Sequence, residues 1–276
     1  MEYKTRLIFA YYVNTNDLDN IIYKYHLYYI NEEIDLFNYV DIYLCIDDIS
    51  NIELIDNIKQ FILSNLNNVN SQHTYINFYI IENNQYYREG LIYYKYFINE
   101  LSSYANNNEL VLFAHTKGLT NNNLNNTLDW IGLLYYFNLR LFWYPKYKLT
   151  DDEFNTIAYG ALYNYSLRNL SKYKWIYYGG FSWVNSVRLN NYIVQNNISF
   201  NKSRLQNIRT CAEDWLPNIL NVDKICFYEC ERYNMYNDSI KYEPGNLPYN
   251  NIIQVAIQKM HTEQYIDYIN SYKVKL

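Results

Sequence analysis

Short apolar runs alternate with longer amphipathic segments over the first 120 residues of this 276-residue chain. The runs are "RLIFAYYV" (6–13), "VDIYLCID" (40–47), "INFYIIEN" (76–83) and "ELVLFAHTKG" (109–118), and a segment with helix-like apolar spacing separates each run from the next. This alternation is typical of βαβ units, in which parallel strands are covered by helices. We therefore expect an α/β fold with an open, mostly parallel, Rossmann-like sheet.

The second half of the chain predicts more helix than strand. A largely apolar helix is expected over 129–143, and "TDDE" (150–153) matches a capping box that starts a helix reaching to about residue 170. "WIYYGGFSWVNS" (175–186) indicates a strand interrupted by Gly179 and Gly180, with Ser186 as the N-cap of the next helix. Further helices are expected from 211–220 and over 255–272. Only 7 Gly and 4 Pro are present, so no linker is visible and one domain over 1–276 is predicted.

Charge and apolar patterning exclude several classes of protein. The net charge is −5 and the 23 Lys and Arg residues are dispersed, which argues against a nucleic-acid partner. The apolar stretches are too short to span a bilayer, and charges lie too close to the first run for a signal peptide. We expect a soluble, cytoplasmic protein. The four cysteines form no CxxC pair and are predicted to be reduced thiols; a zinc site of Cys226, Cys230 and His261 is the alternative.

His115, Lys117 and Gly118 follow the fourth apolar run directly. In open α/β sheets, ligands bind at the carboxyl ends of the strands. An imidazole and an ammonium group two residues apart can meet a diphosphate, and a glycine lets the backbone approach it closely. The alternative is an ordinary strand end, closed by a solvated lysine and a capping glycine.

Two later segments carry further candidates. In "GGFSWVN", Gly180 precedes Phe181 and Trp183, whose aromatic faces could stack on a sugar ring; the alternative is a core strand with Trp183 packed inside. In "AEDW", Glu213 and Asp214 stand at an expected helix start, where the helix dipole favours the charged form that a general base needs. The alternative is an ordinary acidic first turn.

The succession "FAHTKG", Trp130, "YGGFSWVN" and "AEDW" resembles a group of viral and bacterial proteins with the glycosyltransferase A fold, related to the rhamnan-synthesis glycosyltransferases. "ENNQYYREG" (82–90) resembles the segment that precedes the "HTKG" strand in that group, with Asn84, Arg88 and Glu89 at the matching positions. The resemblance covers about 5–220. Ser182 and Ile131 depart from the group's pattern, and the fourth strand is not followed by Asp-x-Asp; Asp47 and Asp48 follow the second strand instead.

The resemblance implies an enzyme that moves a sugar from a nucleotide-sugar donor to a glycan or protein acceptor, with 1–120 binding the donor and 121–276 binding the acceptor. A divalent metal, Mn²⁺ or Mg²⁺, is a possible cofactor, with His115 and His261 as its ligands; otherwise fixed cations neutralise the leaving diphosphate. Alternatives are a non-catalytic carbohydrate-binding or virion-associated module on the same fold, and an aromatic-rich interaction protein. The resemblance implies that the protein comes from a giant virus or a bacterium. A viral protein of this kind would act in the host cytoplasm. The implied site residues are Tyr11, Asp47, Arg88, His115, Lys117 and Gly118 for the donor, Gly180, Phe181, Trp183 and Trp215 for the acceptor, and Asp214 or Glu213 as the base.

Overall fold

The computed structural model describes residues 2–13, 20–68, 73–83, 92–116, 124–160, 163–165, 175–177, 180–198, 215–217 and 219–227. Contacts divide the chain into two units, Met1–Phe227 and Tyr228–Leu276, and every described residue belongs to the first unit. The single domain expected over 1–276 stays a prediction, because its last part lies outside the described residues.

A seven-stranded, mostly parallel sheet is the centre of the first unit, as the alternating apolar runs predict. The first four strands in the chain are mutually parallel, whereas the short β8 runs antiparallel to both of its neighbours. The strands in spatial order are β3 (Tyr75–Glu82), β2 (Tyr39–Ile46), β1 (Lys4–Tyr12), β4 (Glu109–His115), β8 (Ser182–Asn185), β5 (Ala158–Gly160) and β9 (Ile225–Phe227). A separate antiparallel pair is formed by β6 (Tyr163–Tyr165) and β7 (Trp175–Tyr177).

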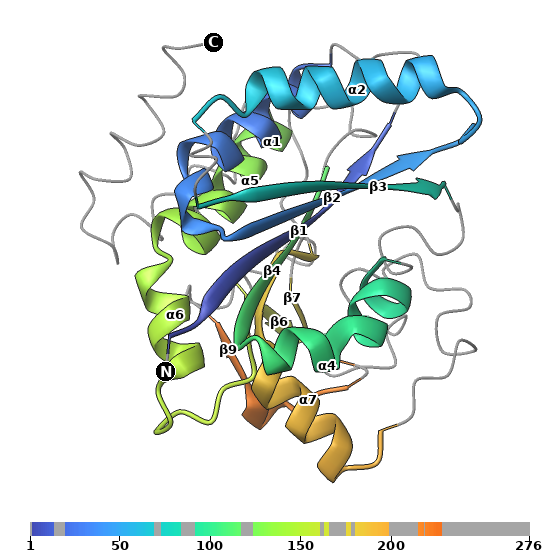
Figure 1. Ribbon diagram of the computed structural model, residues 1–276. Coiled ribbons are helices and arrows are strands. Elements are labelled where there is room, and N and C mark those ends of the chain that lie inside the picture. The colour runs from blue at the N-terminus through green and yellow to red at the C-terminus, as the bar shows by residue number, and fades with distance from the viewer. Residues whose placement is uncertain are drawn as a thin grey trace. The chain divides into compact units, whose positions relative to one another are not determined.

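Helices follow the strands and cover both faces of the sheet (Figure 1). Asparagine side chains cap three of these helices: Asn20, Asn51 and Asn185 accept hydrogen bonds from backbone N–H groups of the first turn. The α-helices are α1 (Ile21–Glu32), α2 (Ile52–Asn65), α4 (Ile98–Asn106), α5 (Leu124–Tyr135), α6 (Trp143–Thr150) and α7 (Ser186–Gln195), with π-helical turns η2 (Ile92–Phe97) and η3 (Tyr136–Arg140) and 3₁₀ turns η1 (Ile34–Leu36) and η6 (Val222–Lys224).

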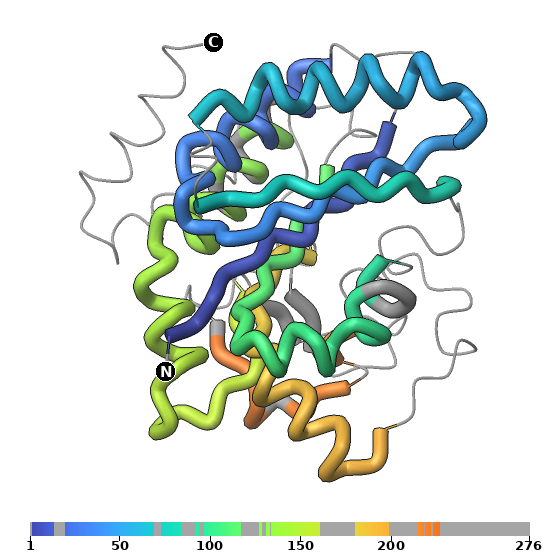
Figure 2. The backbone as a smooth tube through the Cα atoms, viewed as in Figure 1, coloured from blue at the N-terminus to red at the C-terminus, as the bar shows by residue number. Residues whose placement is uncertain are grey.

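Burial along the strands explains why the first runs are continuously apolar. All seven residues of β4 are buried, because this strand lies inside the sheet with neighbours on both edges and cover on both faces. In contrast, β3 alternates between exposed and half-buried residues from Tyr75 to Ile80, and Ile81 is its one buried residue. In Figure 2, the dark-blue β1 runs between the lighter blue β2 and the green β4.

The two faces of the sheet have different aromatic cores. On one face, Phe113 of β4 packs with Phe97 and with Trp215, and α4 packs beside α7. On the other face, Phe9 of β1 packs against His26 of α1. The aromatic residues predicted for ligand stacking are thus divided between the two cores, as shown below.

The predicted helix from Thr150 to about residue 170 is wrong. Thr150 ends α6, and its hydroxyl donates to the carbonyl of Lys146 rather than capping a new helix. The Asp151 carboxylate accepts from the backbone N–H of Glu153, which forms a local turn, and β5 follows. The "TDDE" pattern therefore terminates one helix through side-chain hydrogen bonds instead of starting another.

Other predictions for the second half are partly corrected. The helix after β8 is confirmed, but its N-cap is Asn185 and not Ser186, whose hydroxyl donates to the carbonyl of Glu109. The predicted helix over 129–143 is divided among α5, η3 and α6. Within 211–220, the described residues form turns. The helix predicted over 255–272 lies outside the described residues, and the helix-rich character of the second half is untested.

Candidate functional site

The carboxyl ends of β1 and β4 form the point where the topology of the sheet reverses. After β1, the chain adds β2 and then β3 on one side of β1. It then crosses back and adds β4 on the other side of β1. Ala10 of β1 is the register partner of His115 at the end of β4. Ligands of open α/β sheets bind outside the carboxyl ends of strands at such a switch point. The predicted position of His115 at the end of the fourth strand is confirmed.

Thr116 joins the ends of these two strands. Its backbone N–H donates to the carbonyl of Ala10 over 3.0 Å, and its hydroxyl oxygen accepts from the backbone N–H of Tyr12, also over 3.0 Å. Because Thr116 is only 5% exposed, these bonds are protected from water. Thr116 was not among the predicted site residues, although it lies inside the "HTKG" motif.

His115 and Phe181 come together at the same end of the sheet. Their ring centroids are 5.6 Å apart, and both side chains are buried. Phe181 also packs edge-on against Tyr135 of α5, at 5.2 Å. Gly180 has a φ of 67°, a left-handed conformation that glycine adopts without a Cβ penalty, and it directs the chain into β8. The structure thus joins two motifs that lie far apart in the sequence.

Tyr11 and Asp47 lie on the same edge of the sheet in different environments. Tyr11 is 2% exposed and stacks on Tyr23 of α1 at 4.9 Å, and burial, assisted by Tyr23, raises the pKa of its hydroxyl far above the ordinary value. Asp47 is exposed, and its carboxylate accepts from the side-chain amide of Asn83 over 2.7 Å. Asp47 is thus open to a ligand, whereas Tyr11 is part of the core.

Trp183 lies in the core and not on an open platform. It is fully buried, stacks on Phe37 at 5.9 Å, and lies 4.7 Å from the ring of Phe142. Its indole N–H donates to the backbone carbonyl of Asn138 over 2.8 Å. Because two aromatic rings pack against the indole and its N–H group is already hydrogen-bonded, no face of Trp183 is open to a sugar. We therefore assign Trp183 to the core, which was the alternative for this segment.

Trp215 is equally buried but lies on the opposite face of the sheet. It packs against Phe113, whereas Trp183 pairs in register with the preceding residue, Leu112. Since successive residues of a strand point to opposite faces, the two tryptophans are separated by the sheet. They do not line one cleft, and we assign Trp215 to the core as well.

The remaining predicted site residues lie outside the described part of the chain. For the donor these are Arg88, Lys117 and Gly118, together with Asn84 and Glu89; for catalysis, Glu213 and Asp214; and for a metal, His261.

The described residues do not supply a ligand set for a metal. Among them, no three His, Cys, Asp or Glu side chains gather so that they could hold an ion. His115 has an aromatic neighbour in Phe181, and Asp47 bonds to Asn83. We therefore derive no step through a metal. Cys45 is buried in β2 and Cys226 lies in β9, while Cys230 of the alternative zinc site lies outside the described residues.

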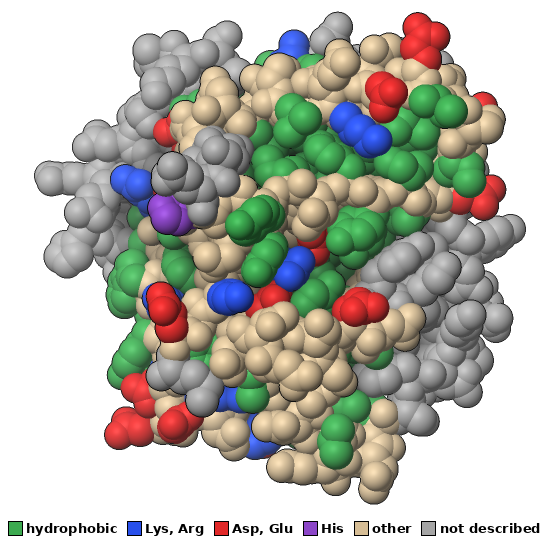
Figure 3. All heavy atoms as spheres, in the orientation of Figure 1, with side chains coloured by type: hydrophobic (Ala, Val, Ile, Leu, Met, Phe, Trp, Pro, Cys, Tyr) green, Lys and Arg blue, Asp and Glu red, His purple; other side chains and the backbone are tan. Residues whose placement is uncertain are grey.

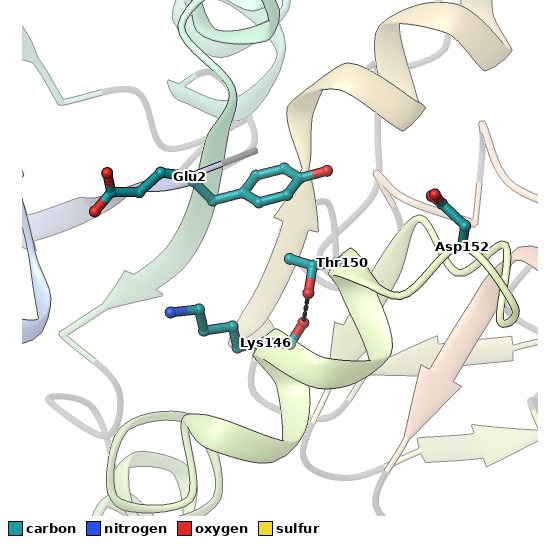
Figure 4. Close-up of a pocket in the computed structure, with 5 residues that line it drawn as sticks. Glu2, Lys146, Thr150 and Asp152 are labelled. Carbon is teal, nitrogen blue, oxygen red and sulfur yellow. Dashed lines mark hydrogen bonds between the residues drawn. The ribbon is translucent and has the colours of Figure 1, made fainter.

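A polar hollow of about 380 Å³ lies near the start of β1, at the opposite end of that strand from Tyr12. Glu2, Tyr3, Lys146, Thr150 and Asp152 line it (Figure 4). The Thr150 hydroxyl is engaged with the Lys146 carbonyl, and Asp152 forms an ion pair with Arg188 at 3.1 Å. This mixture of opposite charges does not select a ligand of one sign, and none of the predicted site residues lines the hollow.

Comparisons with models of known protein families and with curated proteins give no match for this chain. Among the described residues, every helix is too short or too polar to cross a membrane. A functional assignment therefore depends on the geometry at the ends of β1 and β4 and on the motifs of the sequence.

Proposed function

We propose that the protein is a glycosyltransferase of the glycosyltransferase A type, which binds a nucleotide-sugar donor at the carboxyl ends of β1, β2 and β4. The supporting observation is the position of His115, which ends β4 at the topological switch point beside β1. Thr116 fixes that end, and Lys117 and Gly118 follow it directly in the sequence. The rest of the proposal, including a helix-rich acceptor half over 121–276, rests on the resemblance.

Each proposed role follows from what glycosyl transfer requires. The oxygen–carbon bond between diphosphate and sugar breaks, so the leaving phosphate needs positive charge or hydrogen-bond donors. We assign that role to His115 and Lys117, with Arg88 as a further cation, while Asp47 contacts the nucleoside. In a reaction that inverts the anomeric centre, Asp214 or its neighbour Glu213 accepts the proton of the acceptor hydroxyl as the hydroxyl oxygen attacks the anomeric carbon.

A thermal-shift screen against UDP-, GDP-, CMP- and dTDP-sugars tests this proposal. A donor that binds only the folded protein raises its apparent stability by mass action, and we expect one nucleotide class to do so. Each donor is measured with Mn²⁺, Mg²⁺ or EDTA. If the donor still raises the melting temperature in EDTA, side chains and not a metal neutralise the phosphate. A flat response to every donor, with a shift given by free glycans, would instead indicate the non-catalytic carbohydrate-binding module.

A further inference from the structure

The parallel strands β2 and β3 are followed by two polar residues that bond to each other. The last register pair of these strands is Ile46 and Glu82, so Asp47 and Asn83 stand side by side one residue further along. The backbone N–H group of Asn83 donates to the carbonyl of Ile46 over 2.8 Å, and its side-chain amide donates to Oδ1 of Asp47 over 2.7 Å. Asn83 therefore holds the carboxyl end of β2 through both its backbone and its side chain.

This pair offers two acceptor atoms to a ligand. Asn83 occupies Oδ1 of Asp47, and within the described residues no hydrogen bond or ion pair reaches Oδ2 of Asp47 or Oδ1 of Asn83. Because the two oxygens of a carboxylate diverge, the bond from the β3 side turns Oδ2 of Asp47 away from β3. Asp47 is exposed and Asn83 is half-buried, so a ligand can reach both oxygens at once.

A second Asn–Asp pair on the same two strands serves as a comparison. Asn77 of β3 donates to Oδ1 of Asp41 on β2 over 2.8 Å, but the other carboxylate oxygen of Asp41 binds Arg6 at 2.6 Å. Asp41 is also only 1% exposed. The inner pair is thus satisfied by a cation inside the protein, whereas the described part of the chain supplies no cation to the outer pair at Asp47.

The adjacent Asp48 is engaged in its own turn. Its Oδ1 accepts from the hydroxyl and from the backbone N–H of Ser50, over 2.5 and 2.9 Å, and these bonds lower the pKa of Asp48. The turn leads to Asn51, the N-cap of α2. Figure 3 shows acidic side chains near the end of β3, on the right of the view. Of the two adjacent carboxylates, Asp47 is the one that stays available to a ligand.

We propose that Asp47 and Asn83 bind the ribose of the donor and select ribonucleotides over 2′-deoxyribonucleotides, an inference that rests on the proposed function. Ribose carries two vicinal hydroxyls, and one donates to Oδ2 of Asp47 while the other donates to Oδ1 of Asn83. In dinucleotide-binding sheets, an acidic side chain likewise accepts from the ribose 2′-hydroxyl. Only β1 separates this strand end from β4 and His115, so ribose and diphosphate occupy neighbouring parts of one edge of the sheet.

The selection follows from the cost of an acceptor without a donor. A hydrogen bond to a charged group is stronger than one between neutral groups, and a site built to bind a hydroxyl rejects the analogue that lacks it. A 2′-deoxy sugar leaves one acceptor of the pair without its donor, so its affinity should be about 10- to 100-fold lower. Asn83→Leu removes one acceptor and releases the Asp47 carboxylate, so the preference should fall to about threefold or less.

Isothermal titration with paired nucleotides tests the inference. UDP, GDP and CMP are each compared with their 2′-deoxy forms on wild type, on Asn83→Leu and on the matched control Asn77→Leu. Asn77→Leu removes an Asn–Asp hydrogen bond from the same strand but at the inner pair, so it should keep the wild-type preference for ribose. Asn83→Leu should lose that preference, mainly through weaker binding of the ribonucleotide.

Several outcomes would contradict the proposal while the proposed function stands. These are equal binding of both sugars by wild type, a site that prefers dTDP-sugars, and an unchanged preference in a folded Asn83→Leu. Discrimination between bases without discrimination between sugars would place the base at this pair and would equally overturn the ribose assignment. If Asn83→Leu does not fold, the comparison of the two sugars on wild type decides. Absence of binding by every nucleotide would instead reject the proposed function itself, and this inference with it.

Discussion

The guanidinium group of Arg6 forms a two-bonded ion pair with Glu109, with 2.5 Å between Nε and Oε2 and 3.0 Å between Nη2 and Oε1. Glu109 is fully buried, and Asp41, at 2.6 Å, is the second carboxylate on the same guanidinium. The rings of Tyr39 and Tyr104 lie 4.3 and 4.7 Å from its central carbon. Burial alone lowers the pKa of Arg6, but the hydrogen bonds and charges of Glu109 and Asp41 outweigh it and raise the pKa.

Arg6→Met should lower the free energy of unfolding by about 3–5 kcal/mol, because it leaves two buried carboxylates without their cation. Urea denaturation followed by circular dichroism measures this change. Arg140→Met is the matched control, since Arg140 is 59% exposed in its pair with Glu33 and should cost no more than about 1 kcal/mol. Equal losses in the two variants would show that the buried cluster is not a stabilising network.

Trp183→Ala should also destabilise the fold by about 3–5 kcal/mol, since it removes a buried ring and its hydrogen bond to Asn138. Trp143→Ala is the control, because Trp143 is 66% exposed and should change stability by no more than about 0.5 kcal/mol. Thermal or urea unfolding distinguishes the two. A Trp183→Ala protein of normal stability but weakened glycan binding would restore the acceptor-platform role.

Alkaline pH should destabilise the protein through its buried tyrosines. Burial raises the pKa of Tyr11, Tyr43 and Tyr104 above the ordinary value of 10. Above pH 10 the unfolded chain has lost these protons while the folded protein retains them, so stability falls as pH rises. The stability that these tyrosines contribute is fully present below pH 10. Above pH 10, each tyrosine lowers the free energy of unfolding by about 1.4 kcal/mol per pH unit until its folded-state pKa is reached. Denaturation midpoints between pH 8 and 11 measure the slope; a flat profile would contradict the assignment.

β1, β2 and β4 could be predicted because a buried parallel strand leaves a continuous apolar run in the sequence. β3 is largely exposed, and it could be predicted from its β-branched and aromatic residues. The Arg6–Glu109 pair could not be predicted, since the two residues are 103 positions apart and nothing in the sequence around either of them indicates a partner. The "TDDE" pattern predicted a helix start wrongly because Ser, Thr and Asp side chains form hydrogen bonds with the nearby backbone at helix starts, at helix ends and in turns alike. Ala158–Gly160 is too short a strand to show any periodicity.

The position of His115 in the candidate site could be predicted from the sequence, but the burial of the aromatic side chains around the site could not. His115 stands at the strand end where the sequence places it, because strand ends follow from local patterning. The burial of Trp183 and Trp215 depends on which helices cover each face, and that information is distributed over the whole chain. Aromatic side chains serve cores and sugar sites equally well, so residue type alone cannot separate the two roles.

Lys117→Ala should weaken donor binding by about 10- to 100-fold, as expected for a lost charge-assisted hydrogen bond to phosphate. Isothermal titration with the donor identified by the thermal-shift screen measures the affinity. Lys59→Ala is the control, because Lys59 lies on α2, whose residues have no assigned role in donor binding. Unaltered affinity in Lys117→Ala would remove Lys117 from the phosphate site.

Asp214→Asn should lower turnover by about 10²- to 10⁴-fold while donor affinity changes little, because the amide keeps the size of the side chain but cannot accept the acceptor's proton. Release of nucleoside diphosphate in the presence of acceptor glycans measures turnover, and titration measures donor affinity in parallel. Glu213→Gln is the matched control, since it makes the same change one residue earlier. Loss of turnover only in Glu213→Gln would transfer the base role to Glu213, and full activity in both variants would exclude this acidic pair from catalysis. A loss confined to Asp214→Asn, with donor binding intact, separates the chemical step from binding and makes Asp214 the base.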